Sequence, residues 1–253
     1  MILDKFKLNG KVAVVTGAGR GLGQGAAVGF AEAGADVAVV DIISTDETAQ
    51  KIKALGRRVC QVQANLMERP AVKAVVDKVV SDLGGIDILL NNAGIIRRAP
   101  VLEFSEKDWD DVIKLNQDAV FFMSQAAGRQ MVRQGRGGKI INIASMLSFQ
   151  GGIRVPSYTA SKSAVMGLTR LFANELAPHR INVNAIAPGY MATDNTAPLR
   201  ADAQRSSEIL GRIPAGRWGE PGDLQGALVF LASAASDYIT GHTIAVDGGW
   251  LAR

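Results

Sequence analysis

The stretch Thr16-Gly17-Ala18-Gly19-Arg20-Gly21-Leu22-Gly23 decides the fold class, because it joins an apolar run to a helical pattern. We expect Gly17 to allow a tight turn, Gly21 to let the backbone approach a ligand, and Gly23 to let the helix pack on a sheet. Free N–H groups at the start of such a helix favour anions such as the phosphates of a dinucleotide. The glycine spacing is GxxxGxG rather than GxGxxG, and an ordinary tight connection is the alternative.

Six more short apolar runs follow the first, at a spacing too wide for hairpins. None alternates cleanly with polar residues, which is typical of strands buried on both faces of a parallel sheet. Helical patterns lie between them, and we expect an α/β fold: a single Rossmann-type, doubly wound parallel sheet of about seven strands with helices on both faces, in one domain over residues 1–253. The seven runs are Lys11–Thr16, Asp36–Asp41, Arg58–Ala64, Asp87–Asn91, Lys139–Ala144, Ile181–Ile186 and Thr243–Val246.

Helix starts are marked by capping residues and prolines. Capping boxes are expected at Ser44–Glu47 and at Ser105–Asp108, where hydroxyl and acidic side chains precede helical patterns. Pro70 and Pro156 suit the first turns of two further helices, the second of which carries Tyr158.

Composition excludes several classes of function. The net charge of +4 arises from scattered residues with no basic stripe, which disfavours nucleic-acid binding. Cys60 is the only cysteine, so no intramolecular disulfide is possible. The first residues lack the apolar core of a signal peptide, and no apolar run is long enough to span a membrane. A cytoplasmic protein is the simplest expectation.

Asp41 ends the second apolar run, 18 residues after Gly23. A carboxylate there would accept hydrogen bonds from both ribose hydroxyls of an adenosine and repel a 2′-phosphate, which favours NAD over NADP. Arg20 argues the other way, because it could pair with that phosphate. The alternative for Asp41 is a plain loop or helix-capping acid.

Tyr158 and Lys162 lie four residues apart, and therefore on one face of a helix. A phenol keeps its proton until about pH 10, and a neighbouring ammonium lowers that pKa. Such a pair could pass a proton to or from the oxygen of an alcohol or ketone. The spacing also occurs by chance in many helices, so the surrounding motifs must decide.

With those motifs, nearly the whole chain resembles the short-chain dehydrogenase/reductase family. The motifs are Asn91-Asn92-Ala93-Gly94, Asn116, Ser145 placed 13 residues before Tyr158, Lys162, and Pro188-Gly189. The resemblance implies reversible hydride transfer between NAD(H) and a ketone or secondary alcohol. It also implies a homotetramer, for which burial of Trp250 between subunits offers a further argument.

The resemblance assigns roles to the residues that match. Tyr158 would be the general acid or base, and Ser145 would position the substrate oxygen. Lys162 would lower the pKa of Tyr158 and bond the nicotinamide ribose, while Asn116 would hold a water of a proton path. The cofactor contacts implied beside the glycine turn and Asp41 are Asn65, Leu66, Asn92, Ala93, Gly94, Pro188, Gly189 and Thr193. Asn65 stands where the family often has Asp, so its contact to adenine would carry no charge.

Within the family, the similarity is strongest to members that act on deoxy sugar acids. It is carried by Leu102–Asp111, Ser145–Lys162, Ala187–Thr193, Arg212–Trp218 and Ala245–Arg253. A substrate with a carboxylate needs cationic or amide side chains. Arg154 and Gln150 are the main candidates, with Arg97 and Arg217 as further ones. Residues 191–217 would form a helical lid.

Two other functions stay open. A related enzyme could act on another ketone, such as a 3-ketoacyl substrate or a cyclic alcohol. A non-catalytic NAD(H)-binding sensor would be expected to lack Tyr158, Lys162 or Ser145, and all three are present. A metal enzyme is disfavoured, because His179 and His242 lack further ligands at suitable spacing.

Overall fold

All seven expected strands are present in the computed structural model, which describes residues 1–253. They form one parallel sheet in the order β3-β2-β1-β4-β5-β6-β7. Each strand begins and ends within two residues of its expected run, so the predicted fold class is confirmed. The strands are β1 Val12–Thr16, β2 Asp36–Asp41, β3 Val59–Gln63, β4 Ile88–Asn91, β5 Gly138–Ile143, β6 Ile181–Pro188 and β7 Thr243–Val246.

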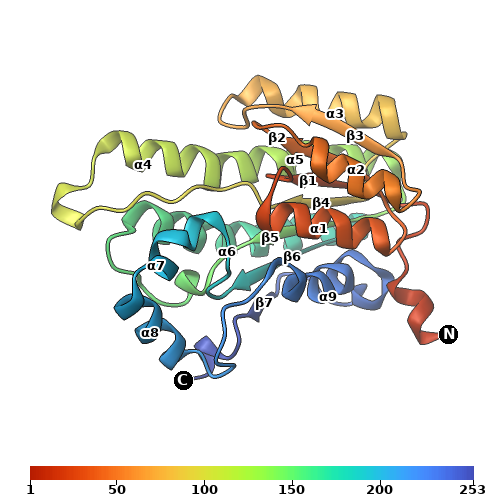
Figure 1. Ribbon diagram of the computed structural model, residues 1–253. Helices are drawn as coiled ribbons and strands as arrows, with labels where there is room; N and C mark the ends of the chain where they lie inside the picture. The colour runs from red at the N-terminus through yellow and green to blue at the C-terminus, as the bar shows by residue number, and fades with distance from the viewer.

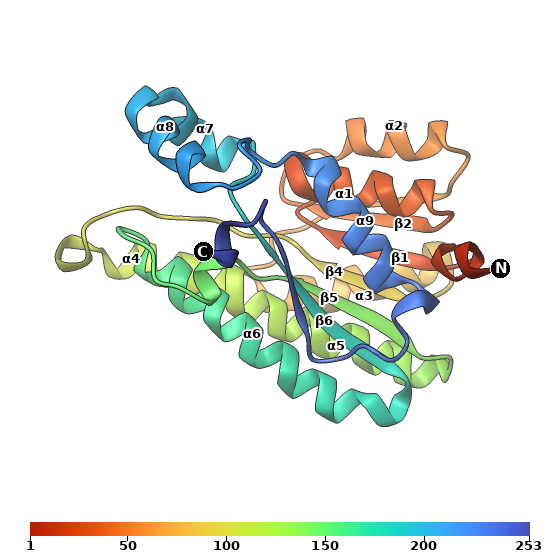
Figure 2. The ribbon, with the colours of Figure 1, turned by 90° about the horizontal axis from the view of Figure 1, so that it is seen from below.

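Helices cover both faces of this sheet. α1, α2 and α9 lie on one face and α3, α5 and α6 on the other, as Figure 2 shows. Of the remaining helices, α4 packs against α6, and α7 and α8 lie together on the opposite side of the carboxyl edge of the sheet (Figures 1 and 2). The helices are α1 Gly21–Glu32, α2 Asp46–Ala54, α3 Arg69–Leu83, α4 Glu106–Ile113, α5 Ala119–Gln134, α6 Pro156–Leu176, α7 Ala197–Ala201, α8 Ala203–Arg212 and α9 Pro221–Ala232.

The two-sided burial of the sheet explains why the apolar runs do not alternate with polar residues. Along β1, Ala13 and Val15 pack into the hydrophobic cluster beneath α1 and α9. Val12 and Val14 point to the opposite cluster, formed with α3 and α5. Because successive side chains face opposite sides of a strand, both sets must be apolar.

The strand order reverses direction between β1 and β4. From β1 the chain proceeds outward to β2 and β3, and then returns to β4 on the other side of β1. In an open parallel sheet, such a reversal leaves a crevice at the carboxyl ends of the two central strands. The turns after β1, β2 and β4 all meet at this edge.

Most of the helix-start signals act as expected. Pro70 and Pro156 occupy the first turns of α3 and α6. Ser105 caps α4, accepting a hydrogen bond from the Asp108 N–H at 3.1 Å, but Asp108 returns no bond to the Ser105 N–H, so only half of the expected capping box forms. The capping box expected at Ser44–Glu47 is wrong, because Thr45 is the N-cap residue and its hydroxyl instead accepts a hydrogen bond from Gln61 at 3.2 Å.

The interpretation of Trp250 is also corrected. Its side chain is buried within a single chain and packs edge-on against Tyr190, with ring centres 4.8 Å apart. The guanidinium of Arg212, at the end of α8, lies 4.1 Å from the centre of the indole. Trp250 therefore anchors α8 to the end of the chain, and it gives no argument for a subunit interface. None of the helices is long and apolar enough to cross a membrane.

Candidate active site

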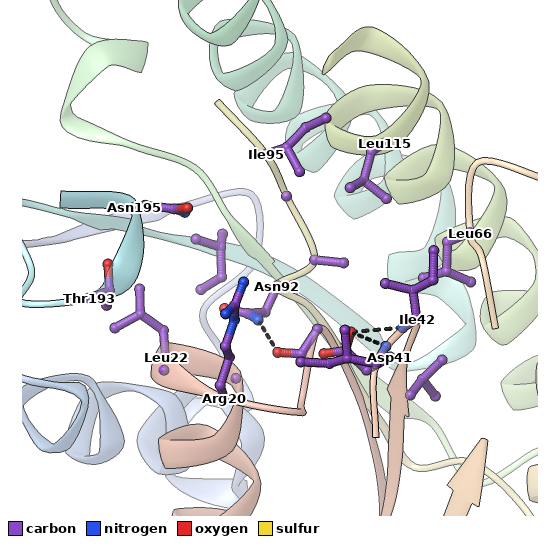
Figure 3. Close-up of a pocket in the computed structure, with 18 of the residues that line it drawn as sticks. Arg20, Leu22, Asp41, Ile42, Leu66, Asn92, Ile95, Leu115, Thr193 and Asn195 are labelled. Carbon is purple, nitrogen blue, oxygen red and sulfur yellow. Dashed lines mark hydrogen bonds between the residues drawn. The ribbon is translucent and has the colours of Figure 1, made fainter. Parts of the chain in front are cut away.

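A cleft of about 410 Å³ lies at the carboxyl edge of the sheet, within the usual size range of ligand pockets. Its walls come from the glycine-rich turn, the ends of β2 and β3, the loop after β4, helix α6 and the segment after β6. Figure 3 shows Thr193 and Asn195 on one side of the cleft and Asp41, Ile42 and Leu66 on the other. The predicted site residues that line it are Gly17, Arg20, Gly21, Leu22, Gly23, Asp41, Asn65, Leu66, Asn92, Ala93, Gly94, Tyr158, Lys162 and Thr193.

The glycine-rich turn requires glycine for two separate reasons. Gly17 and Gly21 have φ values of 67° and 57°, which most residues with a Cβ avoid. A Cβ on Gly23 would collide with the carbonyl oxygen of Gly17, so only glycine lets α1 pack against the turn. Asn92 ties this turn to β4 by donating to the carbonyl oxygens of Thr16 at 2.9 Å and Gly17 at 3.1 Å.

The start of α1 suits the phosphates of a dinucleotide. Arg20 is the N-cap residue and provides no side-chain cap, and the first turn carries no acidic side chain. A Cβ placed on Gly21 would have only the Thr193 methyl group nearby, at 3.8 Å. There is therefore room beside Gly21, and uncapped N–H groups at a helix start favour an anion.

Asp41 organises the end of β2. Its carboxylate accepts hydrogen bonds from the N–H groups of Gly19 at 2.8 Å, Ile42 at 2.7 Å and Ile43 at 3.2 Å. A carboxylate offers about four acceptor positions, so at least one remains for a ligand hydroxyl. The loop-acid alternative thus describes part of what Asp41 does, while its place in the cleft remains compatible with ribose binding.

Lys162 and Tyr158 lie together on the first turns of α6. The Lys162 side chain is buried, and its ammonium donates to the Ile143 carbonyl oxygen at 2.6 Å. It lies 5.7 Å from the centre of the Tyr158 ring. Burial lowers the pKa of Lys162 to about 8.

The pKa of Tyr158 is raised, not lowered as the sequence predicts. Although part of the ring is open to the cleft, burial of the phenol has the largest effect on its pKa. Hydrogen bonding by Ser145 and the charge of Arg98 act in the opposite direction. The correction has a physical reason: burial penalises the phenolate, and Lys162 is engaged by the Ile143 carbonyl instead.

Ser145 and Asn116 do not line the cleft, but they adjoin the residues that do. Ser145 lies two residues after Ile143, which ends β5 and lines the cleft, and its oxygen accepts from the Leu147 N–H at 3.1 Å. Asn116 lies in a π-helical turn, Lys114–Asp118, and is completely buried. Its amide bonds both backbone groups of Ile95, each at 2.9 Å, and so holds the loop that follows Gly94. Its water-holding role stays a prediction.

The candidates for binding a substrate carboxylate differ in how free they are. Arg97 pairs with Asp108 at 3.3 Å, and Arg217 makes two 2.7 Å bonds to Asp223. Gln150 accepts a hydrogen bond from Arg212 at 3.4 Å, away from the cleft walls. These three side chains are therefore already engaged with other groups.

Arg154 is joined through its backbone to Ala99, the neighbour of Arg98. Arg154 has a φ of 64°, uncommon for a residue with a side chain, and its carbonyl oxygen accepts from the Ala99 N–H at 3.1 Å. The adjacent Arg98 donates from Nη2 to the Asn195 carbonyl oxygen at 3.1 Å. Arg98 does not line the cleft, but its charge acts to lower the pKa of Tyr158, so it lies near the site and is a residue to which the sequence reasoning gave no role. The signal was the pair Arg97-Arg98 directly after the NNAG stretch.

The segment after β6 forms the outer wall of the cleft. Pro188 ends β6, and Gly189 packs so closely on Asp247 that a Cβ would come within 2.6 Å of its Cα. These two residues support the wall from behind, whereas Thr193 lines the cleft directly. Most of residues 191–217 is helical, in α7 and α8, as the sequence predicts.

Other reactive groups give no second centre. Burial and the nearby Asp82 carboxylate raise the pKa of the Cys60 thiol to about 12, which suppresses its thiolate form. No group of three His, Cys, Asp or Glu side chains is placed to hold a metal ion.

Comparison with known proteins agrees with this geometry. Residues 11–204 match the profile of the short chain dehydrogenase family. The chain is 66% identical over 253 residues to a 2-dehydro-3-deoxy-D-gluconate 5-dehydrogenase of Escherichia coli (strain K12), covering 100% of both proteins.

Two solved structures superimpose closely. One, provisionally described as a 2-deoxy-D-gluconate 3-dehydrogenase from Agrobacterium tumefaciens with bound NADP, is 54% identical, with a TM-score of 0.94 over 99% of this chain and 100% of that one. The other is a gluconate 5-dehydrogenase from Burkholderia cenocepacia in complex with NADP and tartrate. It is 40% identical, with a TM-score of 0.95 over 100% of both chains.

Proposed function

Because the chain belongs to the short-chain dehydrogenase family, we propose that it transfers a hydride between NAD(H) and a deoxy sugar acid. The reacting group would be a ketone or secondary alcohol of a 2-dehydro-3-deoxy-D-gluconate or 2-deoxy-D-gluconate type of substrate. The observation that carries this proposal is the full-length identity of 66% to an enzyme named for such a substrate. The placement of Tyr158 and Lys162 in the same cleft as the glycine-rich turn supports it.

The residues around the cleft divide the chemistry between them. The nicotinamide cofactor, when bound, would supply or accept the hydride. Tyr158 would exchange a proton with the substrate oxygen, and its raised pKa keeps the phenol protonated, as carbonyl reduction requires. The Ser145 hydroxyl would orient the same oxygen. Lys162 would hold the nicotinamide ribose, and Asn116 would hold a water of the proton path.

We propose NAD rather than NADP as the preferred cofactor, on the basis of the Asp41 carboxylate at the end of β2. Both structural relatives are described with NADP, so this preference needs its own test. Replacing Asp41 with Ala should relax the preference toward NADP(H). Asp41→Asn, which keeps an oxygen to accept from the turn, separates loss of charge from loss of turn structure. If discrimination is unchanged in both variants, Asp41 does not set it.

The substrate carboxylate would be bound by the loop residues Arg98 and Arg154, with Gln150 as a further contact. Arg98 and Arg154 make no ion pair with an acid of this chain, unlike Arg97 and Arg217. A planar guanidinium matches a carboxylate with two parallel hydrogen bonds. The tartrate of the gluconate 5-dehydrogenase structure supports a carboxylate ligand in such enzymes.

Two further features belong to the proposal. Residues 191–217 would close over the substrate and exclude water before hydride transfer. The chain would assemble as a homotetramer through α6, α9 and β7. The outward-facing Ser163 and Gly167 on α6 would permit close helix packing.

The test is a steady-state assay with both cofactors. It measures the reduction of a deoxy sugar acid that carries a ketone and the oxidation of 2-deoxy-D-gluconate. Gluconate and 5-keto-gluconate serve as comparison substrates. Rapid NAD-linked turnover of a deoxy sugar acid is the expected result. If only gluconate is turned over, or if NADH binds and no substrate is turned over, the proposed deoxy sugar acid substrate is rejected. The description of the fold and of the cleft would stand.

A further inference from the structure

An ion pair crosses the cofactor cleft from one wall to the other. Nη1 of Arg20, in the glycine-rich turn, lies 2.9 Å from Oδ2 of Asp194, in the segment after β6. Both residues line the cleft. The two side chains are 70% and 71% exposed. The ion pair is therefore weak, and another charged group can replace either partner.

Arg20 originates next to the place where an adenosine ribose would be bound. Its neighbour Gly19 donates to Asp41 Oδ2 at 2.8 Å. A Cβ on Gly19 would come within 3.0 Å of the same oxygen and 2.8 Å of Ile43, so the turn packs directly on the end of β2. The long Arg20 side chain therefore starts beside Asp41 and is directed to Asp194 on the opposite wall.

No other cation lining the cleft is free to replace Arg20 at this end. Arg97 is paired with Asp108 at 3.3 Å, and Lys162 is bonded to the Ile143 carbonyl beside Tyr158. The residues after Asp41 are Ile42 and Ile43, which carry no charge. Among the cleft-lining side chains, a 2′-phosphate at the ribose could find its counter-ion in Arg20.

We infer that Asp194 is a cofactor-specificity residue: by pairing with Arg20 it withholds the guanidinium from the 2′-phosphate of NADP(H). This inference rests on the cofactor site proposed above. NADPH binding must break the pair to recruit Arg20, whereas NADH binding leaves it intact. Asp194 thus adds to the discrimination against NADP(H) that Asp41 produces by repelling the 2′-phosphate directly. An exposed ion pair is worth about two- to fivefold in affinity, which sets the size of the effect.

The experiment measures dissociation constants of NADH and NADPH for the full chain without substrate, by fluorescence titration at low salt. The variants are Asp194→Asn, Arg20→Gln and the double variant. Asp194→Asn should shift the affinity ratio about two- to fivefold toward NADPH. In the Arg20→Gln background, the same substitution should leave the ratio unchanged. Glu208→Gln is the matched control, because it removes the same charge from the exposed face of α8, outside the cleft.

The outcomes separate this inference from the proposed function. If Asp194→Asn leaves the ratio unchanged, or shifts it equally with and without Arg20, the inference is overturned while NADH binding stands. A Glu208→Gln shift of equal size would overturn it as well, since general charge would then explain the effect. If the unaltered chain binds neither cofactor, the proposed function fails together with the inference.

Discussion

The Lys162 ammonium lies 5.7 Å from the centre of the Tyr158 ring while it donates a 2.6 Å hydrogen bond to the Ile143 carbonyl oxygen. This contact ties helix α6 to the end of β5, where Ser145 follows two residues later. One buried lysine therefore has both a structural partner and a place beside the phenol. Its charge state links stability to the chemistry of the cleft.

Tyr158→Phe should bind NADH with nearly unchanged affinity and lose turnover by about 10²- to 10⁴-fold, because the proton donor is removed and the ring is kept. Fluorescence titration and steady-state rates measure the two quantities separately. Substantial residual turnover would remove Tyr158 from the role of general acid.

The stability of the protein should rise with pH between about 8 and 10. Burial depresses the pKa of Lys162 from 10.5 to about 8, so the unfolded chain binds the proton more readily in this range. The stabilisation is complete above the unfolded pKa of 10.5, decreases as the pH is lowered, and is absent below about 8. Above pH 10 the raised pKa of Tyr158 lowers the stability of the protein as the pH rises, because the phenol ionises more readily in the unfolded chain.

Urea unfolding at pH 7 to 10 tests this linkage against Lys162→Met, which cannot titrate. The free energy of unfolding of the unaltered chain should gain about 2 kcal/mol relative to the variant across the window. Parallel pH profiles for the two proteins would show that Lys162 does not titrate abnormally.

Gly23→Ala should destabilise the chain and abolish cofactor binding, because the new Cβ would collide with the Gly17 carbonyl oxygen. The collision is with backbone, which moves only if the turn is rebuilt. Gly211→Ala in α8 is the matched control, since nothing lies within 4 Å of its Cβ. It should keep NADH binding and stabilise the helix by up to about 1 kcal/mol. Thermal unfolding and NADH titration compare the two, and equal effects would contradict the packing argument.

Asn116→Ala should lower the free energy of unfolding by about 2 to 3 kcal/mol, because both backbone groups of Ile95 lose their partner. The loop that carries Arg98 should loosen, and KM should rise more than cofactor affinity falls. Asn116→Asp keeps an acceptor for the Ile95 N–H but sets a second buried oxygen against the Ile95 carbonyl oxygen, so it should lose at least as much stability. If Asn116→Ala instead lowers kcat alone and stability is unchanged, the residue serves the proton path and not the loop.

Much of this protein is determined by local patterns in its sequence. Apolar runs buried on both faces determine the seven strands, and the spacing of Gly17, Gly21 and Gly23 determines the first turn. Both features depend only on local backbone conformation and burial. The order of motifs also placed Tyr158 and Lys162 at one cleft, since parallel strands carry their following loops to a single edge.

Only the tertiary structure decided how distant charged and aromatic groups are paired. It joined Arg20 to Asp194 across the cleft and buried Trp250 against Tyr190 and Arg212 within the chain. It also showed the pKa of Tyr158 to be raised. Side chains far apart in sequence meet through packing, and burial alters the balance between charged and neutral forms, so no local spacing determines either outcome.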